Sequence, residues 1–166
     1  KMEEKLEAQL RELAGMIDHT ILKPDATKQK VLEVCQECRD YHFKMIAINS
    51  CQVTLCHHAL KGSGVHVGAA ISFPLGQTEL NIKLLETEHA IRQGADEIDY
   101  VVNLTELKSG NWDLVRKEMD RITRLCHQYG KICKVIFETC YLSEEEIIRL
   151  AQIAREVKPD FIKTST

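Results

Sequence analysis

Short apolar runs alternate with longer amphipathic segments along almost the whole chain, and this alternation constrains the fold more than any other feature. Strands are predicted at residues 17–22, 45–49, 66–72, 97–102, 132–138 and 161–166, and helices at 27–41, 53–61, 79–94, 112–130 and 143–157. Ser143 and Glu146 have the spacing of a helix capping box. Alternation of this kind indicates a parallel sheet whose strands are joined by helical crossovers.

Two architectures satisfy that pattern: an open doubly wound sheet and a (β/α)8 barrel. The 166 residues make a chain that is short for a barrel, which usually needs about 250 residues. No linker or change of composition divides the chain, so residues 1–166 are expected to form a single domain. Residues 2–14 are predicted to form an extra N-terminal helix that could cover one end of a barrel.

Several of the predicted strands are interrupted by charged or polar residues, although strands of a parallel sheet are covered on both faces and should be nearly apolar. The interruptions are Asp18 and His19, Asp99, Lys134 and Glu138, and Lys163. Lysine and carboxylate side chains are rarely buried unless they are paired. Interruptions in four different strands suggest that the side chains converge on a common interior, although buried ion pairs or strand ends that reach solvent would also explain each one.

A lysine in such an interior has a specific chemical use. Desolvation and a neighbouring cation lower the pKa of an ammonium group, and the free amine can then attack a carbonyl to form an imine. The iminium withdraws electrons, so an adjacent carbon–carbon bond can break or form, and a nearby carboxylate such as Asp99 can move protons. Lys134 is a candidate for the neighbouring cation, but spacing alone does not choose between Lys134 and Lys163 as the nucleophile.

Composition and charge exclude several other classes of function. The formal net charge is −3 with both signs interspersed, so neither nucleic acid nor a membrane surface is an expected partner. Seven cysteines without a regular framework, and no apolar leader, indicate the cytoplasm. The Cys35-x-x-Cys38 pair falls within a predicted helix and the group around Cys56 matches no zinc spacing, so no metal or other cofactor is expected. His66 is expected at the surface.

Six segments together resemble the class I deoxyribose-phosphate aldolases. They are, in order, IDHTILKPDAT, ISFPLG, GADEIDYVVNL, LKSG, KVIFET and DFIKTST, and the resemblance runs from about residue 14 to the end. It implies a (β/α)8 TIM barrel and a metal-independent carbon–carbon lyase. The implied reaction is reversible cleavage of 2-deoxy-D-ribose 5-phosphate, in deoxyribonucleotide catabolism, to D-glyceraldehyde 3-phosphate and acetaldehyde. The small-molecule partners are therefore a phosphorylated sugar and acetaldehyde, and a homodimer is common among similar barrels.

The resemblance also implies roles for particular residues. Lys163 falls on the Schiff-base lysine and Asp99 on the proton relay. Asp18 and Thr20 fall on positions that line the site, and Thr166 is similar to a threonine that helps to hold the sugar. Two further residues of the matching fifth strand, Lys134 and Glu138, are expected to support the site. The second predicted strand departs from the family pattern, because Ala47 and Ser50 stand where relatives often have cysteine and proline.

Family chains continue beyond the KTST segment, so the barrel is expected to be present only through its sixth strand, with the C-terminal part missing. A second active-site lysine and the phosphate-binding loops are expected in that part. Two alternatives remain open: another lysine-imine aldolase of phosphorylated sugars, and an inactive barrel fragment that self-associates through its open sheet edges.

Overall fold

The computed structural model describes residues 1–166 and contains one parallel sheet. Its strands are β1 (Asp18–Ile21), β2 (Met45–Asn49), β3 (His66–Ile71), β4 (Glu97–Val101), β5 (Ile132–Ile136) and β6 (Phe161–Lys163). They pair in the order β1-β2-β3-β4-β5-β6, and every neighbouring pair is parallel. All six predicted strands are therefore present, with ends that differ by up to a few residues.

The helices fill the intervals between the strands. They are α1 (Met2–Ala14), α2 (Lys28–Tyr41), α3 (Val53–Ala59), α4 (Leu80–Gln93), α5 (Leu104–Lys108), α6 (Trp112–Gln128) and α7 (Glu144–Val157), with short 3-10 turns at Ser50–Gln52 and Thr139–Tyr141. The predicted capping box is present at the start of α7. Helix α5 was not predicted; it has only five residues, and the side chain of Asn103 caps it. No helix is both long and apolar enough to cross a membrane.

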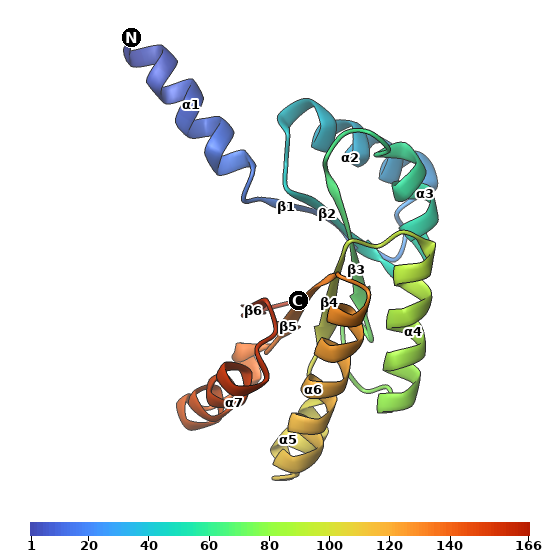
Figure 1. The fold of residues 1–166 in the computed structure, drawn as a ribbon, viewed down its shortest axis with the longest axis vertical. Helices are drawn as coiled ribbons and strands as arrows, with labels where there is room; N and C mark the ends of the chain where they lie inside the picture. Colours follow the sequence, from blue (N-terminus) through green and yellow to red (C-terminus); the bar gives the residue numbers. More distant parts are fainter.

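The sheet is curled, and this decides between the two predicted architectures. The strand order follows the sequence without reversal, whereas a doubly wound sheet reverses at a switch point. In a flat sheet β1 and β6 would lie roughly 24 Å apart, since neighbouring strands are about 4.8 Å apart. Instead Oδ2 of Asp18 on β1 lies 3.3 Å from Nζ of Lys163 on β6. The six strands therefore form a half-barrel, with the helices that follow β1 outside it (Figure 1).

Alternate residues of the strands belong to two different environments. One parity, exemplified by Ile46, Val67 and Ile98, faces the helices and joins a core cluster of 30 buried residues. The other parity faces the inside of the curl, where Asp99 and Lys134 are adjacent in register. Burial of the apolar parity against α2, α3, α4, α6 and α7 provides the main driving force for folding, whereas the inner parity contains the charged side chains.

Helix α1 stands away from this arrangement. It projects from the start of β1 and contacts no face of the sheet in Figure 1. None of its residues is buried, and Leu6, Leu10 and Leu13 are each more than half exposed. The helix predicted at residues 2–14 is thus present, but it does not cover an end of the curled sheet.

A second group of buried charges lies outside the curl, behind β4. Lys83 of α4 is fully buried, and its Nζ donates to the carboxylate of Glu118 on α6 at 2.9 Å and to the carbonyl of Val101 at 2.7 Å. The other oxygen of Glu118 accepts the backbone N–H of Asn103 at 3.0 Å. Burial lowers the pKa of Lys83 and raises that of Glu118. The pair fixes the carboxyl end of β4, the strand that carries Asp99.

Replacement of Lys83 by Met should lower the free energy of unfolding by about 3–5 kcal/mol, because it leaves the Glu118 carboxylate buried without its partner. The double variant Lys83→Met/Glu118→Leu should recover much of that loss, because it removes both charges. Urea unfolding measures both changes, with exposed Lys117→Met as the control. A Lys83→Met protein within about 1 kcal/mol of the wild type would show that the pair contributes little to stability.

Candidate functional site

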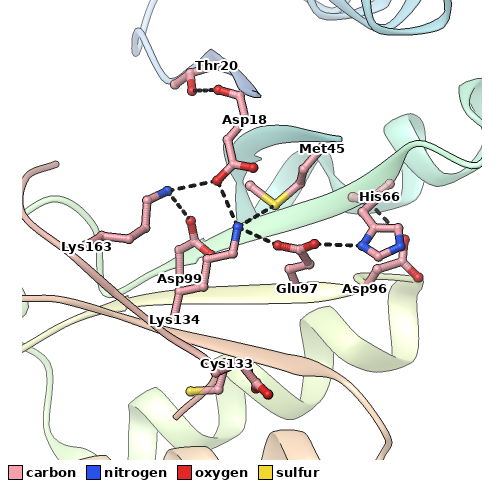
Figure 2. A network of polar contacts seen from close by, with 12 residues as sticks. Asp18, Thr20, Met45, His66, Asp96, Glu97, Asp99, Cys133, Lys134 and Lys163 are labelled. Carbon is pink, nitrogen blue, oxygen red and sulfur yellow. Dashed lines mark hydrogen bonds and ion pairs between the residues drawn. The ribbon is translucent and has the colours of Figure 1, made fainter. Parts of the chain in front are cut away.

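Four of the predicted site residues meet inside the curl (Figure 2). Asp18 comes from β1, Asp99 from β4, Lys134 from β5 and Lys163 from β6. One oxygen of Asp18, Oδ2, accepts from both lysines, at 2.8 Å from Lys134 Nζ and 3.3 Å from Lys163 Nζ. Lys163 Nζ also donates to Asp99 Oδ2 at 2.7 Å. Residues as much as 145 positions apart in the chain thus form one ionic cluster.

Asp99 is the most deeply buried carboxylate in direct contact with Lys163, with 4% of the residue exposed. Burial raises the pKa of Asp99, although attraction to Lys163 and Lys134 opposes this change. Its second oxygen, Oδ1, is buried and has no hydrogen-bond partner in the protein. Asp99 therefore combines a raised pKa with a free acceptor atom, which are the properties of a group that takes up and releases a proton.

The two lysines have different surroundings. The side chain of Lys134 is 7% exposed and contacts the carboxylates of Asp18 at 2.8 Å and Glu97 at 2.5 Å. Burial opposes its charge, but attraction to Asp99 and the contacts with Asp18 and Glu97 outweigh burial and raise the pKa of Lys134. Lys134 is thus held as an ammonium ion.

The side chain of Lys163 is 29% exposed and lines a cavity of about 160 Å³. Lys163 is the only lysine or arginine in the lining, so it is the amine that a small molecule in the cavity can reach. Three of the other lining residues carry hydroxyl groups, and most of the rest are small or apolar. The full set is Thr20, Leu22, Ala47, Gly68, Ala70, Phe73, Asp99, Ile136, Ser165 and Thr166.

The size of the cavity follows from small residues on the inner parity of β2 and β3. Ala47, Gly68 and Ala70 carry at most a methyl group, and a β-carbon on Gly68 would collide with the side chain of Met45. Phe73, in the predicted ISFPLG segment just after β3, supplies an aromatic wall. Space for a ligand thus exists where the small inner residues face the charged ones.

Glu138 and Thr166 lie at the carboxyl ends of β5 and β6. Glu138 has a left-handed backbone conformation, with φ of 56°, and this conformation is uncommon for a residue other than glycine. Its carboxylate accepts from the Thr166 backbone N–H at 3.0 Å and from the Thr166 hydroxyl at 2.6 Å. Glu138 therefore ties the segment that follows Lys163 to the end of β5. Thr20 donates to the carbonyl of Asp18 at 2.9 Å and also lines the cavity.

Two residues that were not predicted to belong to the site, Glu97 and His66, join the ionic cluster. Glu97 is 1% exposed, and its Oε1 lies 2.7 Å from Nδ1 of His66. His66, expected at the surface, has a side chain only 31% exposed, because its ring turns toward Glu97. A signal for Glu97 was present: it stands two residues before Asp99 in a strand, so both side chains point to the same face.

The comparisons with known proteins agree with this geometry. Residues 13–166 match the family model described as DeoC/LacD family aldolase. The chain is 51% identical over 157 residues to the deoxyribose-phosphate aldolase of Lactobacillus acidophilus and 50% identical over 157 residues to that of Bacteroides thetaiotaomicron. In both cases 95% of this chain is aligned, and it spans 66% of the relative's length.

A solved structure extends the comparison to three dimensions. The tetrameric deoxyribose phosphate aldolase of Aeropyrum pernix superposes with a TM-score of 0.86 at 31% identity, and the match covers 93% of this chain and 64% of that one. The likeness includes the strands that carry the ionic cluster, because the aligned part is almost the whole chain. By sequence and by fold, this chain belongs to the DeoC/LacD family of aldolases.

Proposed function

We propose that this protein is a class I aldolase that forms an imine on Lys163 and reversibly cleaves 2-deoxy-D-ribose 5-phosphate to D-glyceraldehyde 3-phosphate and acetaldehyde. The observation that carries the proposal is the position of the Lys163 amine. It lines the cavity 2.7 Å from the buried carboxylate of Asp99, while the other lysine of the cluster is held away by Asp18 and Glu97. The names of the relatives support the choice of substrate.

The chemistry follows from this arrangement. The neutral amine of Lys163 attacks the aldehyde carbon C1 of the open-chain sugar, and loss of water leaves a protonated imine. Removal of the proton from the C3 hydroxyl then breaks the C2–C3 bond, and the electron pair passes into the iminium to form an enamine. D-Glyceraldehyde 3-phosphate leaves, C2 takes up a proton, and water hydrolyses the imine to release acetaldehyde. Asp99 is assigned to these proton transfers, directly or through one water molecule, because of its raised pKa and free Oδ1.

The remaining predicted residues have supporting roles in this proposal. Thr20 and Thr166 offer hydroxyl groups to the sugar at the cavity wall. Asp18 holds the Lys163 amine and is itself held by Lys134, and Glu138 orients Thr166. The cavity lining contains no basic side chain besides Lys163, so the phosphate-binding groups are assigned to residues other than those of this cavity. The choice of deoxyribose phosphate over another phosphorylated sugar in this proposal is therefore supported by the names of the relatives and not by the lining of the cavity.

We infer that the six strands are the first part of a (β/α)8 barrel formed by residues 1–166 together with further strands. The contact of β1 with β6 across the interior and the unpaired outer edges of these two strands support closure by additional strands. Association into a homodimer remains a prediction, and the Aeropyrum pernix relative is described as tetrameric.

Borohydride reduction in the presence of acetaldehyde should trap a stable adduct on Lys163, because reduction converts the imine into a secondary amine. Intact mass and peptide mapping locate the adduct, and Lys163→Met should lose it. Lys61→Met, which changes an exposed lysine, should trap as the wild type does. A folded protein that forms no adduct, or forms it on another lysine, would refute the proposed mechanism.

Replacement of Asp99 by Asn should slow turnover of deoxyribose phosphate by ~100-fold or more, the usual contribution of a general acid–base group. The amide keeps the size of the side chain but cannot exchange a proton. Steady-state kinetics measure the change, and the exposed Asp113→Asn is the matched control. A loss of only a few-fold would reduce Asp99 to a structural role.

Replacement of Lys134 by Met should lower the free energy of unfolding by about 3–5 kcal/mol at neutral pH, because three carboxylates lose their shared cation. The pKa of Lys134 is raised in the folded state above its ordinary value of 10.5. The stability due to the lysine is therefore fully present below pH 10.5 and is lost as the pH rises through the higher folded value. Urea unfolding at several pH values should show a constant difference from the wild type up to that point and a smaller one above it. A difference that grows with pH would contradict this assignment of charge.

A further inference from the structure

Glu97 has no role in the chemistry described above, yet it is one of the most completely buried charged residues of the protein. It lies on the inner parity of β4, two residues before Asp99. Its two oxygens bridge different partners: Oε1 accepts from His66 Nδ1 at 2.7 Å, and Oε2 lies 2.5 Å from Lys134 Nζ. The second contact is an ion pair that lies off the line of a directed hydrogen bond, since Oε2 has no hydrogen-bond partner. Glu97 thus joins a histidine to the ionic cluster.

Continuous contacts connect this histidine with the reactive amine. From His66 they pass to Glu97, Lys134 and the Asp18 oxygen, and that oxygen also holds Lys163 (Figure 2). Each link is 3.3 Å or shorter. Glu97 and Lys134, in the middle of the series, are buried and weakly screened, so a change of charge at one end changes the free energy of protonation at the other. The effect is reciprocal by thermodynamic linkage.

His66 lies at the amino end of the strands, where Asp18, Lys134 and Lys163 also line an opening. It is the first residue of β3, and its side chain is 31% exposed, against 1% for Glu97 and 7% for Lys134. Histidine is the side chain whose charge ordinarily changes between about pH 5 and 8. Proton exchange with solvent can therefore reach the cluster from the end opposite to the catalytic cavity.

Three other charged residues, Asp96, Lys131 and Lys44, lie near this end. Asp96, at the start of β4, accepts the backbone N–H of Val67 at 3.0 Å and lies 3.5 Å from Lys131, which precedes β5. Lys44, just before β2, lines the same opening as Glu97 and Lys134. Glu97 is accordingly the carboxylate that responds directly to a proton on His66.

We propose that Glu97 is a positioning residue for the imine chemistry, and that protonation of His66 controls, through Glu97 and Lys134, how firmly Asp18 holds the Lys163 ammonium. When His66 is protonated, it balances the charge of Glu97. The full charge of Lys134 is then directed at Asp18, the oxygen that Lys163 shares, so the Lys163 ammonium loses stabilisation and the free amine forms more readily. When His66 is neutral, Glu97 takes part of the Lys134 charge and Asp18 holds Lys163 more firmly. This proposal rests on the proposed function of Lys163.

The pH dependence of borohydride trapping tests the proposal. If an amine titrates independently of other groups, its free fraction rises tenfold for each pH unit at pH values below its pKa. In the wild type, loss of the His66 proton should oppose that rise, so the trapping rate should increase by clearly less than tenfold per unit between about pH 5 and 8. His66→Gln should form the adduct with the full tenfold dependence, because glutamine donates to Glu97 but does not titrate. Glu97→Gln should form the adduct about 3–10-fold faster than the wild type at a fixed pH near 7.5. Its trapping rate should also rise by the full tenfold per pH unit.

A second measurement separates the coupling from the aldolase chemistry. The ring of His66 is followed by NMR as a function of pH in the wild type and in Lys163→Met, with Lys108→Met, a lysine on α5 outside the cluster, as the control. Removal of the Lys163 charge should change the pH dependence of the His66 ring signals, because a cation no longer opposes the imidazolium. The control variant should leave it unchanged.

The outcomes for the two proposals differ. If no adduct forms on Lys163 at any pH, the proposed function fails, while a His66 titration that moves in Lys163→Met still supports the coupling. If adducts form, but the pH profiles of wild type, His66→Gln and Glu97→Gln coincide, the proposal for Glu97 is overturned. A His66 titration that is the same in Lys163→Met and in the wild type would overturn it as well.

Discussion

The rest of the site depends on one interaction, the contact of a single Asp18 oxygen with both Lys134 and Lys163. This oxygen holds both lysines of the cluster, and it does so across the curl, from the first strand to the fifth and sixth. Without the curvature of the sheet these side chains could not meet. Without a carboxylate between them, two cations in a buried space would repel each other at high cost. The curvature of the backbone and the charge balance of the interior are therefore both required for the site to form.

The interior of the curl is small and charged in composition, whereas the layer that stabilises the fold is apolar. On the outer parity of the strands, apolar side chains pack against the helices and provide the main gain in free energy. On the inner parity, alanine and glycine leave a cavity, and five charged side chains from β1, β4, β5 and β6 surround or approach it: Asp18, Glu97, Asp99, Lys134 and Lys163. The apolar outer layer provides the free energy that offsets the cost of burying these polar groups. Ser72 and Glu138 adopt positive φ at the carboxyl ends of strands in this region.

Two buried lysines, Lys83 outside the curled sheet and Lys134 inside it, show how the surroundings of a lysine determine its pKa. Lys83 has a lowered pKa, because burial outweighs attraction to one carboxylate. Lys134 has a raised pKa, because several carboxylates outweigh its burial. Lys163 meets the cavity between two carboxylates, and it is the lysine of the cluster that a substrate can approach. Neighbouring charges thus set the pKa of Lys83 and Lys134 in opposite directions, whereas access to the cavity distinguishes Lys163 as the candidate nucleophile.

The sequence by itself determined the order of strands and helices, because apolar periodicity and helix caps are local properties, as the capping box of Ser143 illustrates. It also indicated a shared interior, since charges such as Asp99 and Lys134 interrupt strands that ought to be apolar. Local patterns do not carry the curvature of the sheet or the partners of each charge. Only the tertiary structure decided that the sheet curls and that Lys134 is enclosed while Lys163 lines the cavity. It also brought His66 and Glu97 into the cluster, because contacts between residues up to 145 positions apart depend on how the strands bend around one another.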